Sequence, residues 1–205
     1  MGAGPRRALA LAMRSVCVFC GSNFGAREAY SEAARQVGRA IAARGLRLVY
    51  GGSKVGLMGV LADAALEAGG TVVGVIPAAL VEREVAHAGL TELHQVKSMH
   101  ERKAAMADLS DGFIALPGGA GTLEEMFEIW TWAQLGHHRK PVGLLNVDGF
   151  FDALIAFLDH QAGERFMRQE HRDMLLVETE PVRLLDRFAV YEPPVVTKWI
   201  TRGER

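Results

Sequence analysis

Residues 113–125 read FIALPGGAGTLEE and join a short apolar run to a segment of helical period through three glycines. Short apolar runs bounded by turn residues are typical of strands that are buried on both faces of a sheet. The glycines end such a strand, and Thr122 has a side chain that can cap the helix expected over residues 122–135. The stretch therefore predicts a strand, a loop and a helix in succession, which is the repeating unit of parallel sheets.

The same alternation recurs along the chain on both sides of this stretch. We expect the other strands at residues 15–19, 46–50, 72–76 and 142–145, with an edge strand at 174–177. We expect the other helices at residues 28–44, 57–68 and 181–188. Because crossovers between parallel strands are right-handed, this order predicts an α/β fold: a Rossmann-like, doubly wound, mainly parallel sheet with helices on both faces.

Length and composition fit one globular domain. Within the 205 residues we expect an N-terminal extension over 1–14, a single nucleotide-binding domain over 15–190 and a C-terminal tail over 191–205. The 23 basic and 24 acidic residues nearly cancel, so no overall field favours binding to nucleic acid or to a membrane surface. No apolar run approaches the roughly 18 residues that a membrane span needs.

The two cysteines, Cys17 and Cys20, lie three residues apart in an apolar run. In a strand this spacing directs the two side chains to opposite faces, so they are poorly placed to form a disulfide. A zinc site would need a second pair or a histidine cluster at ligand spacing, which the sequence does not offer. We therefore expect buried thiols in a reducing cytoplasm, and neither a metal ion nor a cofactor.

Ligands of such sheets bind at the carboxyl ends of the strands, and glycines gather there in this sequence. Residues 20–23, 51–59 and 117–122 each follow an expected strand. Over 117–122 the glycines free the backbone amides and a helix begins, so its dipole adds positive charge and the loop can cradle a phosphate. The alternative is a tight turn in which Glu124 and Glu125 are ordinary acids of the first helical turn. The spacing fits neither a Walker loop nor a dinucleotide fingerprint.

A second helix start is marked by Ser98 and Glu101, which have the spacing of a capping box. Arg102 and Lys103 follow at once, where cations oppose the helix dipole, and this indicates another reason for their presence. The alternative is a solvated basic turn on the surface. Glu84 lies in the loop after the third strand, in a short charged run that would by itself face solvent.

At these residues the sequence resembles the Lonely Guy family of cytokinin riboside 5′-monophosphate phosphoribohydrolases. The similarity runs from about Ser15 to Phe188, and the family's signature Pro-Gly-Gly-x-Gly-Thr-x-x-Glu stands at Pro117–Glu125, preceded by the Arg102-Lys103 pair. Further similar segments lie at 18–22, 50–52, 56–59, 74–77, 131–136 and 140–146. Ser53-Lys54-Val55 departs from the pattern, because relatives usually keep a small residue after the Gly-Gly pair.

The resemblance implies a Rossmann-type homodimer, with sites near its interface, that hydrolyses N6-modified adenosine 5′-monophosphates to the free base and ribose 5-phosphate. It implies that Arg102 and Glu125 are catalytic and that Glu84, Lys103, 118–124 and Thr131 line the substrate site. With residues at the strand ends and helix start added, the expected substrate contacts are Gly21, Ser22, Gly52, Glu84, Met99, Arg102, Lys103, Pro117, Gly118, Gly119, Ala120, Gly121, Thr122, Leu123, Glu124, Glu125 and Thr131.

The chemistry of this reaction suits the two catalytic candidates. Breaking the bond between C1′ and the base builds positive charge on the ribose and negative charge on the departing purine. Glu125 can stabilise that cation or orient water, and the permanently charged Arg102 can fix the phosphate or the leaving base.

Two other functions compete with this one. The chain could act on AMP itself as a general purine nucleotide nucleosidase, or it could carry a nucleotide or a molybdopterin-type cofactor without catalysis. A carrier has no need of a buried acid, so Glu125 together with Arg102 disfavours it. A pyridoxal-phosphate decarboxylase is disfavoured because nothing marks a Schiff-base lysine among Lys54, Lys97, Lys103, Lys140 and Lys198.

Overall fold

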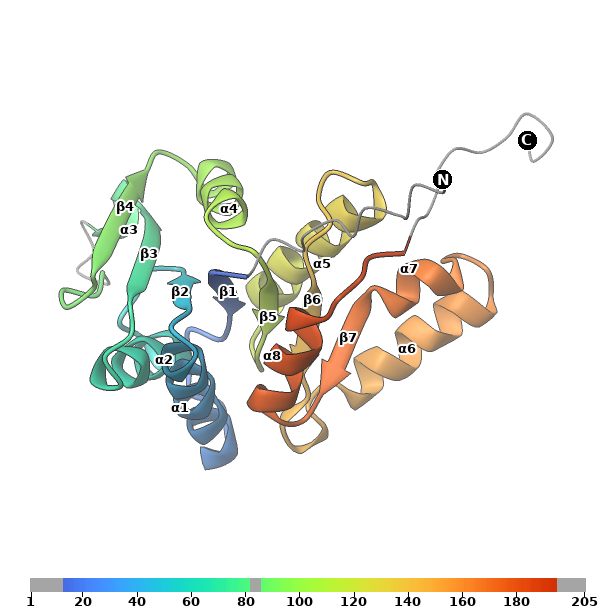
Figure 1. Ribbon diagram of the computed structural model, residues 1–205, viewed down its shortest axis with the longest axis horizontal. Coiled ribbons are helices and arrows are strands. Elements are labelled where there is room, and N and C mark those ends of the chain that lie inside the picture. Colours follow the sequence, from blue (N-terminus) through green and yellow to red (C-terminus); the bar gives the residue numbers. More distant parts are fainter. Residues whose placement is uncertain (1–12, 82–85, 195–205) are drawn as a thin grey trace, which may run out of the picture.

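The computed structural model describes residues 13–81 and 86–194, and Figure 1 shows how their helices and strands are arranged. The strands are β1 (Ser15–Phe19), β2 (Arg47–Tyr50), β3 (Val72–Pro77), β4 (Glu92–Val96), β5 (Phe113–Ala115), β6 (Val142–Leu145) and β7 (Leu175–Glu178). The helices are α1 (Glu28–Ala43), α2 (Gly56–Glu67), α3 (Ala78–Val81), α4 (Met99–Asp108), α5 (Ala120–Gln134), the 3-10 turn η1 (Val147–Gly149), α6 (Asp152–Gly163), α7 (Gln169–Asp173) and α8 (Pro181–Ala189).

One sheet of seven strands runs through the molecule in the order β4-β3-β2-β1-β5-β6-β7, and every neighbouring pair is parallel. The chain winds outward from β1 to β4 and then returns to place β5 beside β1. The strand order therefore reverses between β1 and β5, which is the point where ligands bind in such sheets. The predicted Rossmann-like, doubly wound fold is confirmed, and β7 is an edge strand as expected.

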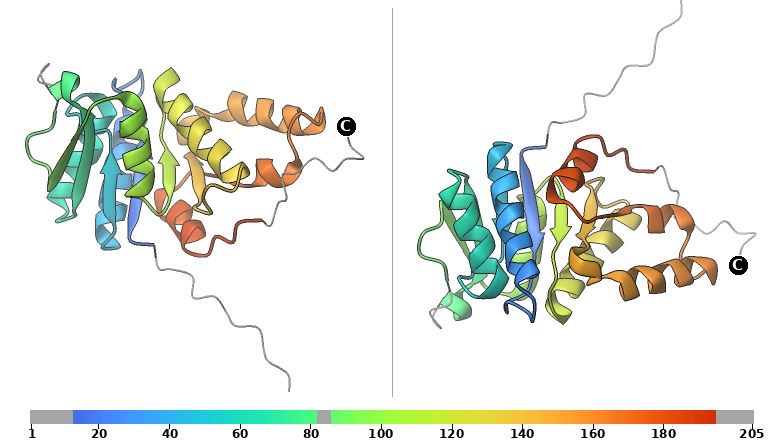
Figure 2. Two further views of the ribbon diagram at one scale, coloured as in Figure 1. Left: turned by 90° about the horizontal axis from the view of Figure 1, so that it is seen from above. Right: turned by 90° about the horizontal axis from the view of Figure 1, so that it is seen from below.

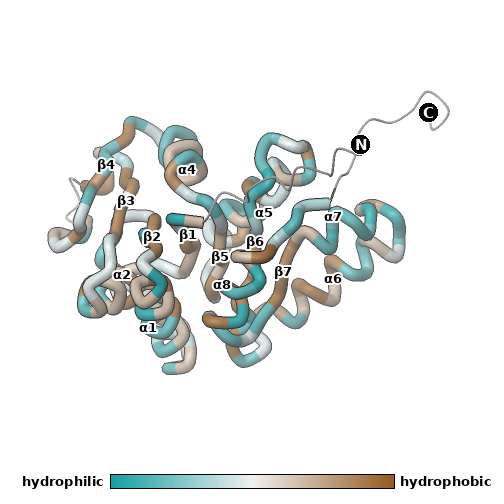
Figure 3. The backbone as a smooth tube through the Cα atoms, in the orientation of Figure 1, coloured by the Kyte–Doolittle hydropathy of each residue, from teal (hydrophilic) through white to brown (hydrophobic). Residues whose placement is uncertain are grey.

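Helices cover both faces of the sheet. Helices α1, α2 and α8 pack on one face, and α4, α5 and α6 pack on the other. The two views of Figure 2 show α1 and α2 in front of the sheet from one side and α4 and α5 in front of it from the other. Hydrophobic residues gather along the strands between these layers, while hydrophilic residues are frequent along helices such as α1 and α8 (Figure 3).

Strand β1 shows why the sequence pattern was informative. Its side chains alternate between the two cores, with Val16 and Val18 in one and Cys17 and Phe19 in the other. Cys20 follows in the first core, so the two cysteines lie on opposite sides of the sheet, both buried and both free, as predicted. Burial raises the pKa of both thiols well above their ordinary value.

Some elements were not predicted from the sequence. Strand β4 is mostly exposed and polar, so it lacks the apolar pattern of a buried strand, and it exists because its backbone pairs with β3 at the sheet edge. Helices α6 and α7 also carry no clear periodic signal. The expectation for Thr122 is wrong: α5 begins at Ala120 with Gly119 in the capping position, so Thr122 lies inside the first turn.

Three predicted features lie wholly or partly outside the described residues. They are the predicted N-terminal extension over 1–14, of which 1–12 are not described, the predicted C-terminal tail over 191–205, of which 195–205 are not described, and Glu84. The described chain is already tied to the sheet before residue 15, because the Arg14 amide donates to Asp111 Oδ2 at 2.8 Å. Within the described ranges, no helix combines the length and the apolar character that crossing a membrane requires.

Candidate active site

Three loops meet at the carboxyl edge of the sheet, next to the point where the strand order reverses. The Gly21 amide donates to the Pro117 carbonyl at 3.1 Å, and the Leu57 amide donates to the Gly21 carbonyl at 3.1 Å. At Gly56, which has a φ of +57°, an added Cβ would lie 2.3 Å from the carbonyl carbon of Ser22. The loops after β1, β2 and β5 therefore pack backbone against backbone, and this contact fixes the floor of the candidate site.

The glycines of the signature have different roles. A Cβ on Gly118 would lie 2.2 Å from Thr122 Oγ1 and 2.9 Å from the Gly21 amide nitrogen, so the fold itself needs a glycine there. At Gly119 and Gly121 an added Cβ would have no atom within 4 Å. These two glycines border open space, which a ligand can approach closely.

The start of α5 offers unused hydrogen-bond donors. Among the described residues, no acceptor is found for the backbone amides of Ala120, Gly121 and Thr122, and the first two of these residues are exposed. The capping residue is Gly119, which has no side chain to accept from them, and the first turn contains no acid. Glu124 and Glu125 lie in the second turn, so the reading of them as first-turn acids is wrong. This helix start has the amides and the uncompensated dipole that bind an anion.

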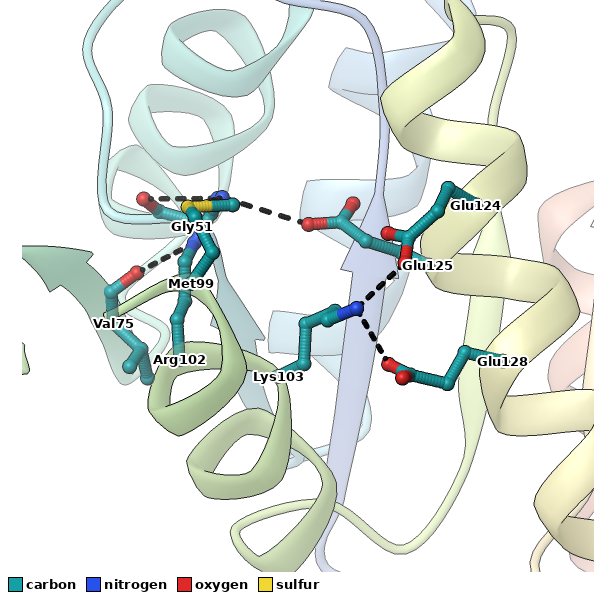
Figure 4. A network of polar contacts seen from close by, with 8 residues as sticks. All are labelled: Gly51, Val75, Met99, Arg102, Lys103, Glu124, Glu125 and Glu128. Carbon is teal, nitrogen blue, oxygen red and sulfur yellow. Dashed lines mark hydrogen bonds and ion pairs between the residues drawn. The ribbon is translucent and has the colours of Figure 1, made fainter.

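Arg102 is buried between α4 and the ends of β2 and β3. Its Nε donates to the Val75 carbonyl at 3.1 Å and its Nη2 to the Gly51 carbonyl at 3.4 Å, while Nη1 lies 3.5 Å from Glu125 Oε1 (Figure 4). A Cβ on Gly51 would lie 2.0 Å from Nη2, so the guanidinium occupies the space that a side chain would fill. The alternative of a solvated basic turn is therefore wrong for Arg102.

The carboxylate of Glu125 faces this guanidinium across the gap between α4 and α5 (Figure 4). Its side chain is only 12% exposed. Burial raises the pKa of Glu125, and the opposing charge of Arg102 lowers it, with burial the larger effect. The result is a shielded acid beside a fixed cation, about one turn further along α5 than the free amides.

Lys103 points to a different part of α5. Its Nζ lies 2.6 Å from Glu124 Oε1 and 3.0 Å from Glu128 Oε2, and its side chain is 10% exposed. The hydrogen bond to Glu124 is the main reason why the pKa of Lys103 is raised, so the amine stays charged. Two of the expected substrate contacts, Lys103 and Glu124, thus pair with each other.

Helix α4, which carries Arg102 and Lys103, begins where the sequence predicted. Ser98 Oγ accepts from the Glu101 amide at 3.1 Å, as in a capping box, but Glu101 Oε2 accepts from the Lys97 amide rather than from that of Ser98. Met99 is 47% exposed, and its sulfur lies 3.9 Å from Arg102 Nη1.

Other expected contacts lie further from this centre. Gly52, with a φ of +74°, turns its Cβ position toward Ile76 and Leu93, so its glycine serves the packing of the loop. Leu123 packs against the core beneath α5. Thr131 is exposed and lies six residues after Glu125, about 9 Å along the helix axis, so the described chain does not bring it to the free amides.

Two residues of this network were not anticipated from the sequence. Gly51 and Glu128 contact the cations directly, yet neither was among the expected site residues. The available signals were weak: Gly51 is the first of a glycine pair after a strand, and Glu128 stands four residues after Glu124 on the same helix face.

Fold and site together define a class: a Rossmann-like α/β protein with free amides at a helix start and a largely buried arginine–glutamate pair where its strand order reverses. The comparisons with known proteins narrow this class. A family model described as "Possible lysine decarboxylase" matches residues 58–188.

A cytokinin riboside 5′-monophosphate phosphoribohydrolase of Rhodococcoides fascians is 54% identical over 165 residues, which are 80% of this chain and 83% of the relative. The enzyme of that name from Arabidopsis thaliana, LOG5, is 47% identical over 180 residues, which are 88% of this chain and 79% of the relative. The chain belongs to the cytokinin riboside 5′-monophosphate phosphoribohydrolase family.

Solved structures share the fold at greater distance. A molybdenum cofactor binding protein from Rippkaea orientalis superposes with a TM-score of 0.64 at 22% identity, covering 86% of this chain and 96% of that one. At this identity the likeness concerns the fold alone, because one fold carries many functions.

Proposed function

We propose that this chain hydrolyses the N-glycosidic bond of N6-modified adenosine 5′-monophosphates, releasing the free base, a cytokinin, and ribose 5-phosphate. Relatives of that activity are about half identical in sequence over most of the chain. The observation that carries the proposal is the pairing of buried Glu125 with Arg102 beside the free amides of α5. A protein that only carries a nucleotide has no use for such an acid.

The 5′-phosphate binds at the start of α5. The amides of Ala120, Gly121 and Thr122 donate to its oxygens, and the helix dipole adds attraction without a lysine. Open space above Gly119 and Gly121 lets the phosphate approach the backbone. This contact fixes one end of the substrate, so that the ribose lies over the next turn of the helix.

Bond cleavage takes place at the anomeric carbon. The bond between C1′ and the purine nitrogen breaks, its electron pair leaves with the base, and a water oxygen adds to C1′, while the two protons of water are shared between the new hydroxyl and the base. The ionised Glu125 stabilises the positive charge that builds on the ribose and orients the attacking water. Because its carboxylate is shielded from solvent, this attraction is stronger than it would be in water.

Arg102 supplies a fixed positive charge on the other side of the cleaved bond. Two backbone carbonyls already hold Nε and Nη2, so the guanidinium needs little reorganisation when negative charge develops on the substrate. A guanidinium stays protonated, so Arg102 acts as an electrostatic clamp.

The proposal is tested by incubating the protein with isopentenyladenosine 5′-monophosphate and, separately, with AMP, and separating the products by chromatography. We expect free isopentenyladenine and ribose 5-phosphate. Faster release of adenine from AMP would instead make the chain a general purine nucleotide nucleosidase. Release of no base from either nucleotide would contradict the proposal and favour a carrier. The Glu125→Gln variant, purified in parallel, controls for contaminating hydrolases.

We further propose that the chain works as a homodimer with sites near the interface. The family resemblance supports this arrangement, as do the exposed apolar side chains of Leu93, Met99 and Leu135, which are 38%, 47% and 48% exposed. Light scattering on the protein as it elutes from a sizing column should give twice the chain mass, and a monomer would contradict this.

We propose a cytoplasmic location, which the two buried free thiols, Cys17 and Cys20, support, since such thiols are typical of reducing compartments. Fractionation of the source cells with an antibody to the chain tests this, and recovery outside the cytoplasm would contradict it.

A further inference from the structure

Lys103 is clamped by two carboxylates of α5. Glu124 and Glu128 are one helical turn apart, so both reach toward α4 from the same face. Figure 4 shows the Lys103 ammonium between them, and its charge also acts on the Glu125 carboxylate. These two carboxylates therefore hold the buried Lys103 ammonium near Glu125, the acid that is catalytic in the proposed function.

The two carboxylates of the clamp differ in exposure. The Glu124 side chain is 57% exposed, whereas that of Glu128 is 27% exposed. Solvent screens an exposed ion pair strongly, so the shorter contact to Glu124 restrains Lys103 less than its length suggests. Glu128 Oε2 is shielded from solvent and, among the described residues, has the Lys103 ammonium as its partner. Loss of either member of this pair leaves the other charge poorly compensated.

Charged and titratable groups surround Glu125 from every element packed against it. These groups are Cys17 from β1, Cys20 directly after β1, Arg102 and Lys103 from α4, and Glu124 and Glu128 from α5. The charge of Lys103 lowers the pKa of Glu125 and that of Glu128 raises it. The two members of the pair thus act on Glu125 with opposite sign.

We infer that Glu128 is a positioning residue: it holds the Lys103 ammonium between α4 and α5, so that the catalytic carboxylate keeps a second cation beside it. In this role Glu128 acts through Lys103, which its carboxylate contacts at 3.0 Å. The inference rests on the proposed function insofar as it assigns the catalytic role to Glu125.

The pH dependence of kcat/KM in the Glu128→Gln variant distinguishes positioning from a direct charge effect. We call the fall of kcat/KM at low pH the acid limb of the profile. The substitution removes a negative charge near Glu125. If Lys103 stays in place, the pKa of Glu125 therefore falls and the acid limb moves to lower pH. If Glu128 positions Lys103, the ammonium moves into solvent, the pKa of Glu125 rises and the limb moves up. Because the charge of Lys103 affects the pKa of Glu125 more than that of Glu128 does, we expect a net upward shift of the limb. An unchanged limb, or a downward shift, overturns the inference.

In a protein that already carries Lys103→Gln, the expected effect of Glu128→Gln on the acid limb has the opposite sign. Lys103→Gln alone should move the acid limb up, because the cation is lost. In that background Glu128→Gln should move it down again, since only the repulsion between Glu128 and Glu125 remains to be removed. The exposed Glu67, whose side chain has no hydrogen bond or ion pair among the described residues, provides the control Glu67→Gln, and this variant should leave the limb in place.

Amine labelling tests the position of Lys103 without any turnover. Brief treatment with acetic anhydride, followed by peptide mass spectrometry, reports the fraction of Lys103 that is acetylated. We expect strong protection in the wild type and several-fold more labelling in Glu128→Gln, with exposed Lys54 as the internal reference. Equal protection in both proteins overturns the inference. A wild type that hydrolyses no monophosphate would contradict only the proposed function, and the labelling would still decide whether Glu128 positions Lys103.

Discussion

Replacing Gly51 by alanine tests whether the position of Arg102 controls turnover. The new Cβ would lie 2.0 Å from Arg102 Nη2 and 3.2 Å from both Arg102 Cζ and Met58 Sδ. Ordinary contact begins at 3.4 Å, so the end of the guanidinium must retreat by about 1.4 Å. The φ of Gly51 does not lie in the left-handed region, so the backbone accepts alanine without strain.

That displacement breaks the hydrogen bond from Nη2 to the Gly51 carbonyl and moves Nη1 away from Glu125. A misplacement of about 1 Å at a catalytic group costs on the order of 10²-fold in rate. We therefore expect Gly51→Ala to lower kcat/KM by about 100-fold, which corresponds to roughly 2.7 kcal/mol of lost transition-state stabilisation. The assay follows release of free base from isopentenyladenosine 5′-monophosphate by chromatography.

Two comparisons make this result interpretable. Gly163→Ala adds a Cβ in a helix with nothing within 4 Å, and this variant should retain full activity. If Gly51→Ala acts through Arg102, the double variant Gly51→Ala with Arg102→Ala should lose no more activity than Arg102→Ala alone. A folded Gly51→Ala protein with wild-type kcat/KM would refute the reasoning, as would losses that simply add in the double variant.

Other changes at the site have equally definite outcomes. Glu125→Gln should retain nucleotide binding, measured by calorimetry, and lose turnover by about 10²-fold or more, and near-normal hydrolysis would remove Glu125 from the mechanism. Arg102→Ala should lower kcat/KM for the monophosphate by roughly 10²-fold to 10³-fold, and unchanged catalytic efficiency would rule out the electrostatic role of Arg102. Because the mechanism needs ionised Glu125 and burial raises its pKa, activity should fall with decreasing pH at values above the ordinary glutamate pKa of about 4.3, and a limb at or below that value would contradict its burial. Gly118→Ala should lower the melting temperature, because the new Cβ meets Thr122 Oγ1 and the Gly21 amide, whereas Gly121→Ala should leave the fold and its melting temperature intact, as checked by calorimetric unfolding.

The sequence determined the layers of this protein and the edge of the sheet at which its candidate ligand site lies. Apolar runs such as 15–19 and 142–145 become strands because their side chains are buried on both faces, and this preference is local enough to be visible in one chain. The glycines after β5 mark the proposed anion-binding loop for a similar reason, since close approach to a backbone requires the absence of a side chain.

Tertiary structure decided what the sequence pattern could not. Strand β4 has no apolar signal and exists only through its pairing with β3. The position of Arg102 depends on Gly51 and Val75, which are distant in sequence, and the partner of Lys103 depends on how α4 packs against α5. Thr122 was expected at the helix cap and instead packs against Gly118. Strands and glycine loops follow from the preferences of neighbouring residues, whereas charge partners follow from contacts between elements, which no short stretch of sequence encodes.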